Sequence, residues 1–530
     1  MLARRPSRLL VALALIVAST TTALGLWLNR RFYHDDALIT LRYVTNMLAG
    51  EGIVWNSGER VEGYTNFAHL LFIGLLGATG LDLMVASRLV NLLALLALAA
   101  FVWRYLAREA RDEPQGLGLY ALPAGLLIVC AWALLVWAMG GLEAPLFALF
   151  CSVGIWTFRR ELGSGFASER GLLMSGVAFA LAATTRMDAM LVVSVSAAAL
   201  LLAVVRRRAP WRRLAAFLLP VGLIFGGYFL WRLSYYGALL PNTFYAKGGA
   251  PGALRLLTGT AYISVYLFAP PFPLLACLLA LPFAVRRRAL TSQDHYLGLV
   301  VVSYLGYVLL VGGDHMPGFR FIVPMIPSIC LLLASVLAHG LGSRGALLLY
   351  ALLIIGAPLQ IFSPYLAVVY RDPAAYVGSI VGDYIAKAWP AGSTVALSTA
   401  GSVPYYAMQH RYIDMLGLND PVIARREVNE IRLANQKLPG HLKGDGAYVL
   451  ARQPDYIILG PAQGIPADQP WFLSDLELQE SPEFHRRYYM VQVQLDVSAV
   501  PDHEAYPVTS SGKLLFTYYQ RIEPVSAAGP

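Results

Sequence analysis

Long apolar runs separated by short polar connections fill the first two thirds of the chain. Runs of this kind indicate membrane-spanning helices, because about 20 apolar residues cross the hydrocarbon core of a bilayer. Eleven spans are predicted, at residues 9–28, 84–107, 117–138, 144–158, 171–185, 189–205, 214–233, 270–286, 296–312, 319–339 and 345–363. Two further apolar stretches, 65–80 and 252–268, are predicted to lie along the membrane surface or to dip into it.

The positions of the arginines decide this assignment, because short arginine-rich connections mark the cytoplasmic side of a membrane protein. Counting 65–80 as a full span would place the later clusters outside. We therefore predict a cytoplasmic N-terminus, a first helix that is retained and not cleaved as a signal peptide, and an extracytoplasmic C-terminus. The clusters placed inside are Arg4/Arg5/Arg8, Arg104/Arg108/Arg111, Arg159/Arg160, Arg206–Arg208 with Arg212/Arg213, and Arg286–Arg288.

The C-terminal part, from residue 364 to 530, is more polar and differs in pattern from the spans. Short apolar runs predict buried strands at 394–398 and 456–459 and more exposed strands at 488–495 and 514–519. Residues 372–389 have helical spacing. We predict a transmembrane domain over 1–363 and an extracytoplasmic α/β domain over 364–530. This C-terminal part contains no G-x-G-x-x-G and no G-x-x-x-x-G-K-[ST] motif, so nothing in it marks a nucleotide site.

Composition agrees with a polytopic membrane protein. The hydrophobic fraction is 57% and the charged fraction 14%, with a mean hydropathy of +0.57, values that exclude a water-soluble globular chain of this length. The net charge of +9 would fit nucleic-acid binding, but the basic residues lie in short clusters between apolar runs. We interpret them as topology signals and expect membrane lipid, not nucleic acid, as the surroundings of this chain.

The first predicted outer loop, residues 32–66, carries two adjacent acids, Asp35 and Asp36, directly beyond a span. They are either solvated loop acids or a general base with a second acid that orients it or holds a divalent cation. Mg or Mn would suit such a pair, and the residues alone leave metal binding open. Which of the two acids is the base is also left open by the sequence.

Four other polar loops fall on the same side of the membrane, at 140–143, 185–188, 234–249 and 312–320. Recognition of a phosphate would require cations from several of these loops. Lys247 is notable because it is the only one of five lysines that precedes the C-terminal domain. The alternatives are a snorkelling lysine and internal ion pairs of Asp188 and Asp314 with their basic neighbours. The candidate substrate- or phosphate-binding residues are Arg42, Glu143, Arg186, Tyr245, Lys247, Asp314, His315 and Arg320.

Several separated motifs resemble one known superfamily. They are DDALITLRYVTNMLAGEGIVWNSGERVEGYTN (35–66), GGLEAPLF (140–147), YYGALLPNTFYAK (235–247), GGDHMPGFRF (312–321) and DMLGLND (414–420). The first resembles the first extracytoplasmic loop of GT-C glycosyltransferases, which use polyprenyl-phosphate sugars. Among these enzymes the chain looks most like the terminal β-(1→2)-arabinofuranosyltransferases and their bacterial relatives.

The resemblance implies a GT-C fold in a bacterial inner membrane. It implies a polyprenyl-phosphate-linked sugar donor, a sugar such as arabinofuranose, and an envelope glycan or glycolipid as acceptor. An acid of the first outer loop, here Asp35 or Asp36, would lie at the active site, where some members of the superfamily hold a divalent metal. The rival interpretation is a transporter or flippase of a lipid-linked sugar, which would carry paired repeats and charges deep in its spans.

Overall fold

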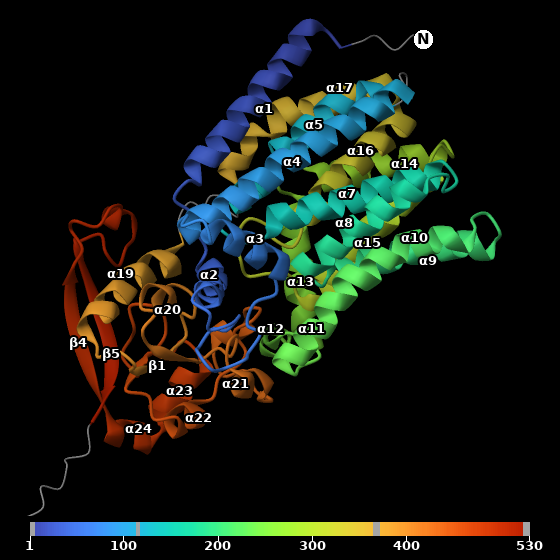
Figure 1. Cartoon of the computed structure of the whole chain (residues 1–530). Coiled ribbons are helices and arrows are strands. Elements are labelled where there is room, and N and C mark those ends of the chain that lie inside the picture. Colours follow the sequence, from blue (N-terminus) through green and yellow to red (C-terminus); the bar gives the residue numbers. More distant parts are fainter. Residues whose placement is uncertain (1–5, 113–116, 364–371, 523–530) are drawn as a thin grey trace, which may run out of the picture. The chain divides into compact units, whose positions relative to one another are not determined.

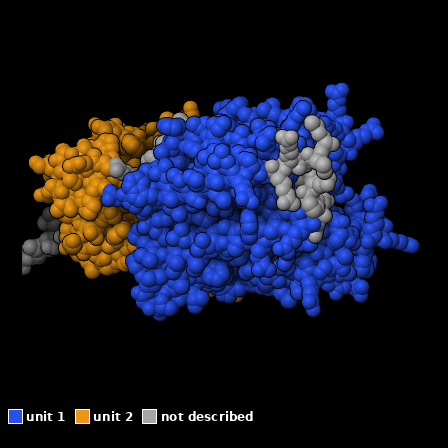
Figure 2. Space-filling view, turned by 90° about the horizontal axis from the view of Figure 1, so that it is seen from above, with its two compact units in different colours: residues 1–32, 66–232, 252–371 blue, residues 33–65, 233–251, 372–530 orange. Residues whose placement is uncertain are grey.

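The computed structural model describes residues 6–112, 117–363 and 372–522, and the chain divides into two compact units (Figure 1). Unit 1 comprises residues 1–32, 66–232 and 252–371, and unit 2 comprises 33–65, 233–251 and 372–530 (Figure 2). The predicted division after residue 363 borders residues 364–371, which lie outside the described residues. Unit 2 therefore combines the C-terminal part with two polar loops from the first part of the chain.

Unit 1 is helical, and a helix occupies every predicted apolar run. Its helices are α1 (Arg8–Leu28), α3 (Phe67–Gly77), α4 (Leu83–Asp112), η1 (Leu117–Leu119), α5 (Ala121–Val129), α6 (Trp132–Met139), α7 (Ala144–Gly163), α8 (Glu169–Thr185), α9 (Ala189–Val205), α10 (Trp211–Pro220), η2 (Val221–Phe225), α11 (Gly226–Tyr236), α13 (Gly252–Leu267), α14 (Pro273–Arg286), α15 (Ser292–Val311), η3 (Val323–Met325), α16 (Ile326–Leu341), α17 (Ser343–Ala351), η4 (Leu352–Gly356) and η5 (Pro358–Phe362). Helix α11 continues into unit 2.

Six helices among the described residues are long and apolar enough to cross a membrane: 8–28, 83–111, 121–139, 211–236, 292–311 and 323–341. Shorter apolar helices lie at 67–77, 189–205, 273–286 and 343–356. The helical, multi-pass character is thus confirmed. The number of spans, eleven, stays a prediction, because several of the expected spans are short.

One predicted span is a broken helix whose free backbone groups are satisfied by a side chain. Helices α5 and α6 are interrupted at Cys130 and Ala131. The buried amide of Gln360 accepts the N–H of Trp132 at 2.8 Å and donates to the carbonyl of Cys130 at 3.1 Å. Because lipid offers no hydrogen bonds, such a break persists only where protein groups replace them.

Unit 2 contains a small mixed α/β fold together with the two polar loops. Its strands are β1 (Thr394–Leu397), β2 (Arg411–Asp414), β3 (Tyr456–Ile458), β4 (Tyr488–Asp496) and β5 (Lys513–Arg521). Its helices are α2 (Asp35–Leu48), α12 (Asn242–Lys247), α19 (Pro373–Ala388), α20 (Ser402–Tyr406), α21 (Pro421–Arg425), η7 (Ala434–Lys437), α22 (Gly446–Ala451), α23 (Leu473–Glu480), α24 (Pro482–Arg487) and η8 (His503–Ala505). The positions of the four predicted strands and of the helix at 372–389 are confirmed. The prediction that 514–519 is a more exposed strand is wrong, because most of β5 is buried against its neighbours.

The five strands form one sheet in the order β2-β1-β3-β5-β4. Strands β2, β1 and β3 are parallel, and β5 runs antiparallel to both β3 and β4. Strand β2 was not predicted, because only Tyr412 and Ile413 are apolar between the charged residues Arg411 and Asp414. The parallel strands direct their carboxyl ends to one edge, which is where open α/β sheets usually bind ligands.

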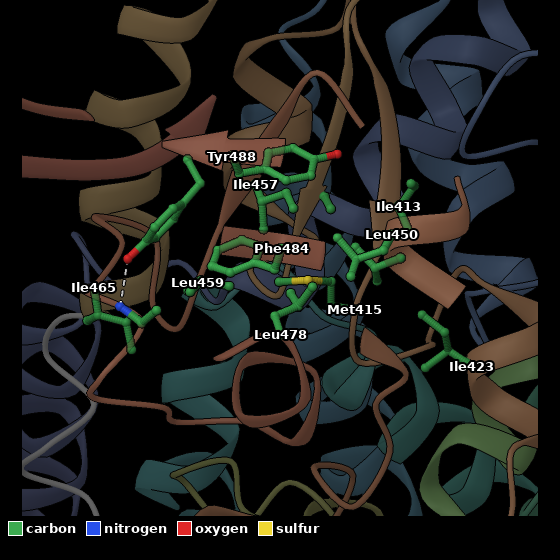
Figure 3. Close-up of a cluster of buried hydrophobic side chains, with 14 residues drawn as sticks. Ile413, Met415, Ile423, Leu450, Ile457, Leu459, Ile465, Leu478, Phe484 and Tyr488 are labelled. Atoms are coloured by element: carbon green, nitrogen blue, oxygen red, sulfur yellow. Dashed lines mark hydrogen bonds between the residues drawn. The ribbon is translucent and has the colours of Figure 1, made fainter. Parts of the chain in front are cut away.

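The sheet packs on an apolar cluster that contains Ile457, Leu459, Phe484, Tyr488 and Tyr519 (Figure 3). The hydroxyl of Tyr519 accepts the backbone N–H of a loop residue, Ala467, at 2.7 Å, so its polar end is satisfied inside the cluster. Phe484 is fully buried and lies between two aromatic neighbours, with ring centroids 4.9 Å from Tyr519 and 5.7 Å from Tyr488.

The substitution Phe484→Ala should destabilise the sheet domain by about 3–5 kcal/mol, because it removes buried apolar surface and leaves a cavity. We expect a lower midpoint of thermal unfolding of the detergent-solubilised full chain, with earlier proteolysis within residues 372–522. Tyr489→Ala, at a position 47% exposed on β4, is the matched control and should leave the midpoint nearly unchanged. Equal midpoints for the two variants would contradict the importance of this cluster.

Candidate active site

The two acids of the first outer loop lie in the first turn of α2, a helix within the predicted loop. His34 is its N-cap, and the imidazole Nδ1 accepts the backbone N–H of Asp36 at 3.2 Å. Acidic side chains in the first turn are favoured by the helix dipole, which helps to explain why the helix begins here.

The Asp35 carboxylate is bound by backbone donors that follow β1. Its two oxygens accept the N–H of Ser402 at 2.7 Å and of Gly401 at 3.1 Å. The N–H of Asp35 in turn donates to the carboxylate of Asp372 at 2.8 Å. A Cβ at position 401 would lie 2.0 Å from the carbonyl oxygen of Asp35, so this approach requires glycine. The carboxyl edge of the parallel strands is thus occupied by a carboxylate of the chain itself.

The electrostatics of Asp35 agree with this buried position. Burial, and then the neighbouring carboxylates of Asp372 and Asp36, raise the pKa of Asp35 to about 6, against the N–H donors of Ser402, which lower it. A raised pKa would by itself suit a general base. However, a base must reach the substrate hydroxyl, and the side chain is only 8% exposed with both oxygens engaged. The geometry favours a positioning role for Asp35.

Asp36 is partly exposed, and the charged groups that it faces differ from those around Asp35. Its carboxylate and the ammonium of Lys247 both act electrostatically on the imidazole of His441. Lys247 is exposed at the end of α12, and its side chain follows the backbone of Gly440. Asp36 and Lys247 therefore both lie close enough to the imidazole of His441, in unit 2, to act on it electrostatically.

Helix α12 is fixed by Asn242, which binds the turn after β2. Its side-chain amide donates to the carbonyls of Gly417 at 2.8 Å and Leu418 at 3.0 Å, and its N–H donates to the carbonyl of Glu62 at 2.9 Å. The guanidinium of Arg425 donates to the side-chain oxygen Oδ1 of Asn242 at 3.2 Å and lies 4.4 Å from the ring centroid of Tyr245. Tyr245 is thus a partner of Arg425 within this scaffold.

The turn itself, 414–420, is held by the buried carboxylate of Asp414. It accepts the N–H of Leu416 at 3.0 Å and that of Asn419 at 2.8 Å. The side-chain oxygen of Asn419 accepts the hydroxyl of Tyr43 at 3.1 Å, which connects the turn to α2. Burial raises the pKa of Asp414 to about 6. This motif therefore binds both polar loops and determines where their side chains lie.

Arg42, a predicted phosphate-binding candidate, is 2% exposed. Its guanidinium donates to the carbonyls of Trp55 at 2.7 Å and His410 at 3.1 Å, and also to that of Pro404. Burial lowers its pKa to about 10. These contacts favour a structural role for Arg42, joining α2 to the segment between β1 and β2.

Unit 1 contains the remaining candidates, and the two arginines among them, Arg186 and Arg320, are paired with carboxylates. Arg186 lies 2.9 Å from Glu143 and 3.1 Å from Asp188, whose carboxylate also accepts the hydroxyl of Tyr304 at 2.9 Å. Burial opposes ionisation of Glu143, but the guanidinium groups of Arg186 and Arg320 lower its pKa below the usual value. The ion pair of Arg186 with Asp188, one of the two alternatives from the sequence, is confirmed.

The second pair in unit 1 joins Arg320 to Asp314 at 2.8 Å, with His315 3.7 Å from the same carboxylate. This internal ion pair is likewise confirmed. Both arginines are therefore partly neutralised by carboxylates in their own unit. Convergence of Arg320 with the acids of the first loop stays a prediction.

The residues around Asp35 and Asp36 do not provide a fitting set of ligands for a divalent cation. Both Asp35 oxygens accept N–H donors, whereas Mg²⁺ and Mn²⁺ need several free oxygen ligands. Within residues 6–112, 117–363 and 372–522, no group of three or more His, Cys, Asp or Glu side chains could hold a metal ion.

Two side chains in unit 2 were not among the predicted site residues. His441 lies in a loop of the C-terminal part, and Arg425 lies in α21. Neither belongs to a recognisable spacing pattern. The only available signal was the flanking of His441 by Pro439, Gly440 and Lys443, which is typical of any polar loop.

Similar structures define the class of this fold. The chain matches ArnT from Cupriavidus metallidurans bound to undecaprenyl phosphate with a TM-score of 0.52 and 14% identity, over 79% of this chain and 88% of that one. The apo state of the same protein matches with a TM-score of 0.52 and 16% identity, over 81% and 90%. The chain therefore shares the fold of ArnT, which agrees with the fold expected from the sequence.

Two sequence relatives carry the same name. Over 234 residues the chain is 31% identical to the terminal β-(1→2)-arabinofuranosyltransferase of Mycobacterium tuberculosis, covering 43% of this chain and 36% of the relative. It is 27% identical over 383 residues to the protein of the same name from Corynebacterium glutamicum, covering 64% and 53%. The chain thus matches about half or less of the length of these relatives. Residues 369–509 match a domain of unknown function, DUF8728.

The substitution Arg42→Met should destabilise unit 2 by about 3 kcal/mol, because three buried carbonyl groups lose their donor. A lower midpoint of thermal unfolding of the full chain in detergent would be the measurement. Arg60→Met is the matched control, since Arg60 lies over the ring of Tyr235 and is exposed. A phosphate-binding role would instead weaken donor binding and leave the midpoint unchanged.

Proposed function

We propose that the protein is a membrane glycosyltransferase that uses a polyprenyl-phosphate-linked sugar. The donor sugar is arabinofuranose or a close relative, and the acceptor is an envelope glycan or glycolipid on the outer face of a bacterial inner membrane. The observation that carries the proposal is the grouping of Asp36 and Lys247 at one imidazole in a chain with a GT-C fold. The names of the relatives and of the ligand in ArnT supply the sugar and the lipid class.

In the proposed reaction, a hydroxyl of the acceptor attacks the anomeric carbon of the donor sugar. Its proton passes to the carboxylate of Asp36, and the bond between the anomeric carbon and the phosphate oxygen breaks. The polyprenyl phosphate leaves with the bonding electrons, and the ammonium of Lys247 stabilises its growing negative charge. The products are the extended glycan, polyprenyl phosphate and a protonated Asp36.

Asp35 supports this reaction without touching the substrate. Its carboxylate is bound to the N–H groups of Gly401 and Ser402, which fixes the first turn of α2 on the sheet edge. Asp36 is the next residue, so its direction follows from this attachment. Asp36 is therefore the base, and Asp35 is a positioning residue.

An apolar groove in unit 1 suits the polyprenyl chain of the donor. It has a volume of about 800 Å³ and is lined by α13, η5 and the residues after them, including Phe268, Pro270, Leu359 and Phe362. In the predicted topology these residues lie near the outer ends of their spans. A hydrocarbon chain bound there would keep its phosphate near the outer boundary of the membrane.

The acceptor glycan is proposed to bind the C-terminal part of unit 2. Trp471 is 46% exposed, and its backbone is fixed on both sides, by the carboxylate of Asp475 at 3.1 Å and by the amide of Asn435 at 3.2 Å. An exposed ring on a fixed backbone is suited to stacking on a sugar. Its neighbour Phe472 stacks on His441, which connects this surface to the proposed transfer site.

The substitution Asp36→Asn should lower sugar transfer by about 100-fold or more, because the amide cannot accept the proton. Transfer would be measured with the purified full chain and a short-chain prenyl-phosphoryl arabinofuranose donor. The fold should be unaffected, and the exposed Asp468→Asn is the matched control. Full activity in Asp36→Asn would contradict its assignment as the base, and full activity in both Asp35→Asn and Asp36→Asn would contradict a role for either loop acid.

Treatment with EDTA should leave the rate of transfer within about twofold of the untreated protein, because the site offers no fitting set of metal ligands. The same assay, before and after dialysis against chelator, is the measurement. Loss of activity that returns only on addition of Mg²⁺ or Mn²⁺ would show that a metal takes part.

A further inference from the structure

Two helices of unit 1, α9 and α14, end in the same short sequence. Residues 205–209 and residues 285–289 both read VRRRA, and all six arginine side chains are exposed. Within the part of the chain that the structure describes, none of the six forms an ion pair or a side-chain hydrogen bond. Each turn therefore presents three guanidinium groups to its surroundings.

The backbone of both turns follows the Schellman motif, in which glycine is the usual residue at the left-handed position. Here that position is occupied by Arg207, with φ 57°, and by Arg288, with φ 52°. The N–H of each donates to the carbonyl three positions earlier, at 2.9 Å in both turns. The next N–H donates to the carbonyl five positions earlier, at 2.8 Å after Arg207 and 3.3 Å after Arg288. Both turns thus carry a cation where the backbone favours glycine.

The two turns lie at the same end of unit 1 (Figure 1). After the first turn α10 begins, and the guanidinium of Arg213 donates to the carbonyl of Ala167 at 2.7 Å, just before α8. After the second turn α15 begins, and the amide of Gln293 donates to the carbonyl of Arg159 at 3.2 Å, near the end of α7. Helices α7 and α8 are joined by the short connection 164–168, so both contacts are made at one end of this helix pair.

Exposed apolar side chains lead up to the arginines on both helices. They are Leu202 and Val205 on α9, and Phe283 and Val285 on α14. The exposed ring of Trp211 follows the first turn, and tryptophan is enriched at the interface between membrane and water. An apolar surface that ends in cations matches a phospholipid, because acyl chains contact the former and the headgroup phosphate contacts the latter. A soluble anion would use only the cations.

We propose that the turns Arg206–Arg208 and Arg286–Arg288 each bind the phosphodiester headgroup of an anionic phospholipid. These residues have no part in the proposed transfer reaction, so the inference is independent of the proposed function. A planar guanidinium donates two parallel hydrogen bonds to phosphate oxygens, and such charge-assisted bonds are stronger than neutral ones. A zwitterionic lipid also brings a cation, which the arginines repel. The turns therefore select lipids with a net negative charge.

The test is native mass spectrometry of the purified full chain in detergent, with equal amounts of phosphatidylglycerol and phosphatidylcholine added. Two molecules of phosphatidylglycerol should stay bound under conditions that remove phosphatidylcholine. Replacing the three arginines of one turn by glutamine should remove one of them, and replacing all six should remove both. The double variant Arg486→Gln/Arg487→Gln, at exposed arginines of α24 in unit 2, is the matched control and should keep both lipids.

The single variants Arg207→Gly and Arg288→Gly separate the charge from the stability of the turn. Glycine fits the left-handed backbone, so the midpoint of thermal unfolding without added lipid should stay the same or rise. Each variant loses one cation, so the affinity of its turn for phosphatidylglycerol should fall about fivefold. If the arginines served only to end the helices, the midpoint would fall and the affinity would not.

Equal binding of the two lipids by the wild-type chain would overturn the proposal, as would binding of phosphatidylglycerol that survives the replacement of all six arginines. Loss of lipid in the control variant would overturn it as well, since any exposed arginine would then suffice. Displacement of the lipid by an equal concentration of soluble glycerol phosphate would show that the turns bind an anion only, and would also contradict a lipid site.

Discussion

The attachment of Asp35 to the N–H groups of Gly401 and Ser402 is the contact on which the proposed site depends. These residues are 366 and 367 positions apart from Asp35 in the sequence, so the bond closes a very long loop of chain. It also buries a carboxylate whose pKa is raised to about 6, which is a cost. The backbone donors offset that cost, because hydrogen bonds to a charged acceptor are stronger than those between neutral groups.

A consequence of this contact is that the edge of the sheet where a ligand usually binds is used to hold other segments of the chain. In open α/β sheets the connections after parallel strands commonly bind anionic ligands, often at the start of a helix. Here the chain supplies the anion itself, and the turn 414–420 binds α12 through Asn242 at the same edge. The C-terminal sheet is therefore a scaffold that orients two polar loops, in addition to any contact it makes with a glycan.

The distribution of charge separates structural from chemical roles. Arg42 donates to backbone carbonyls in the interior, and Arg186 and Arg320 face carboxylates, so each of these cations is already used to hold the fold. Lys247 is exposed at the end of α12 and lies beside the loop that carries His441, so its side chain is accessible from solvent.

The sequence by itself determined the membrane-embedded helices, four of the five strands and the acidic loop, because each depends on local hydrophobic periodicity or on residues adjacent in the chain. It did not determine β2, which is too short and too polar at its ends, or the separate roles of Asp35 and Asp36, which have the same side chain. Those roles depend on which of the two carboxylates accepts the N–H groups of Gly401 and Ser402. The place of His441 was equally hidden, because its partners come from α2 and α12, far away in sequence. Only the tertiary structure brings these segments together, since long-range contacts leave no local pattern.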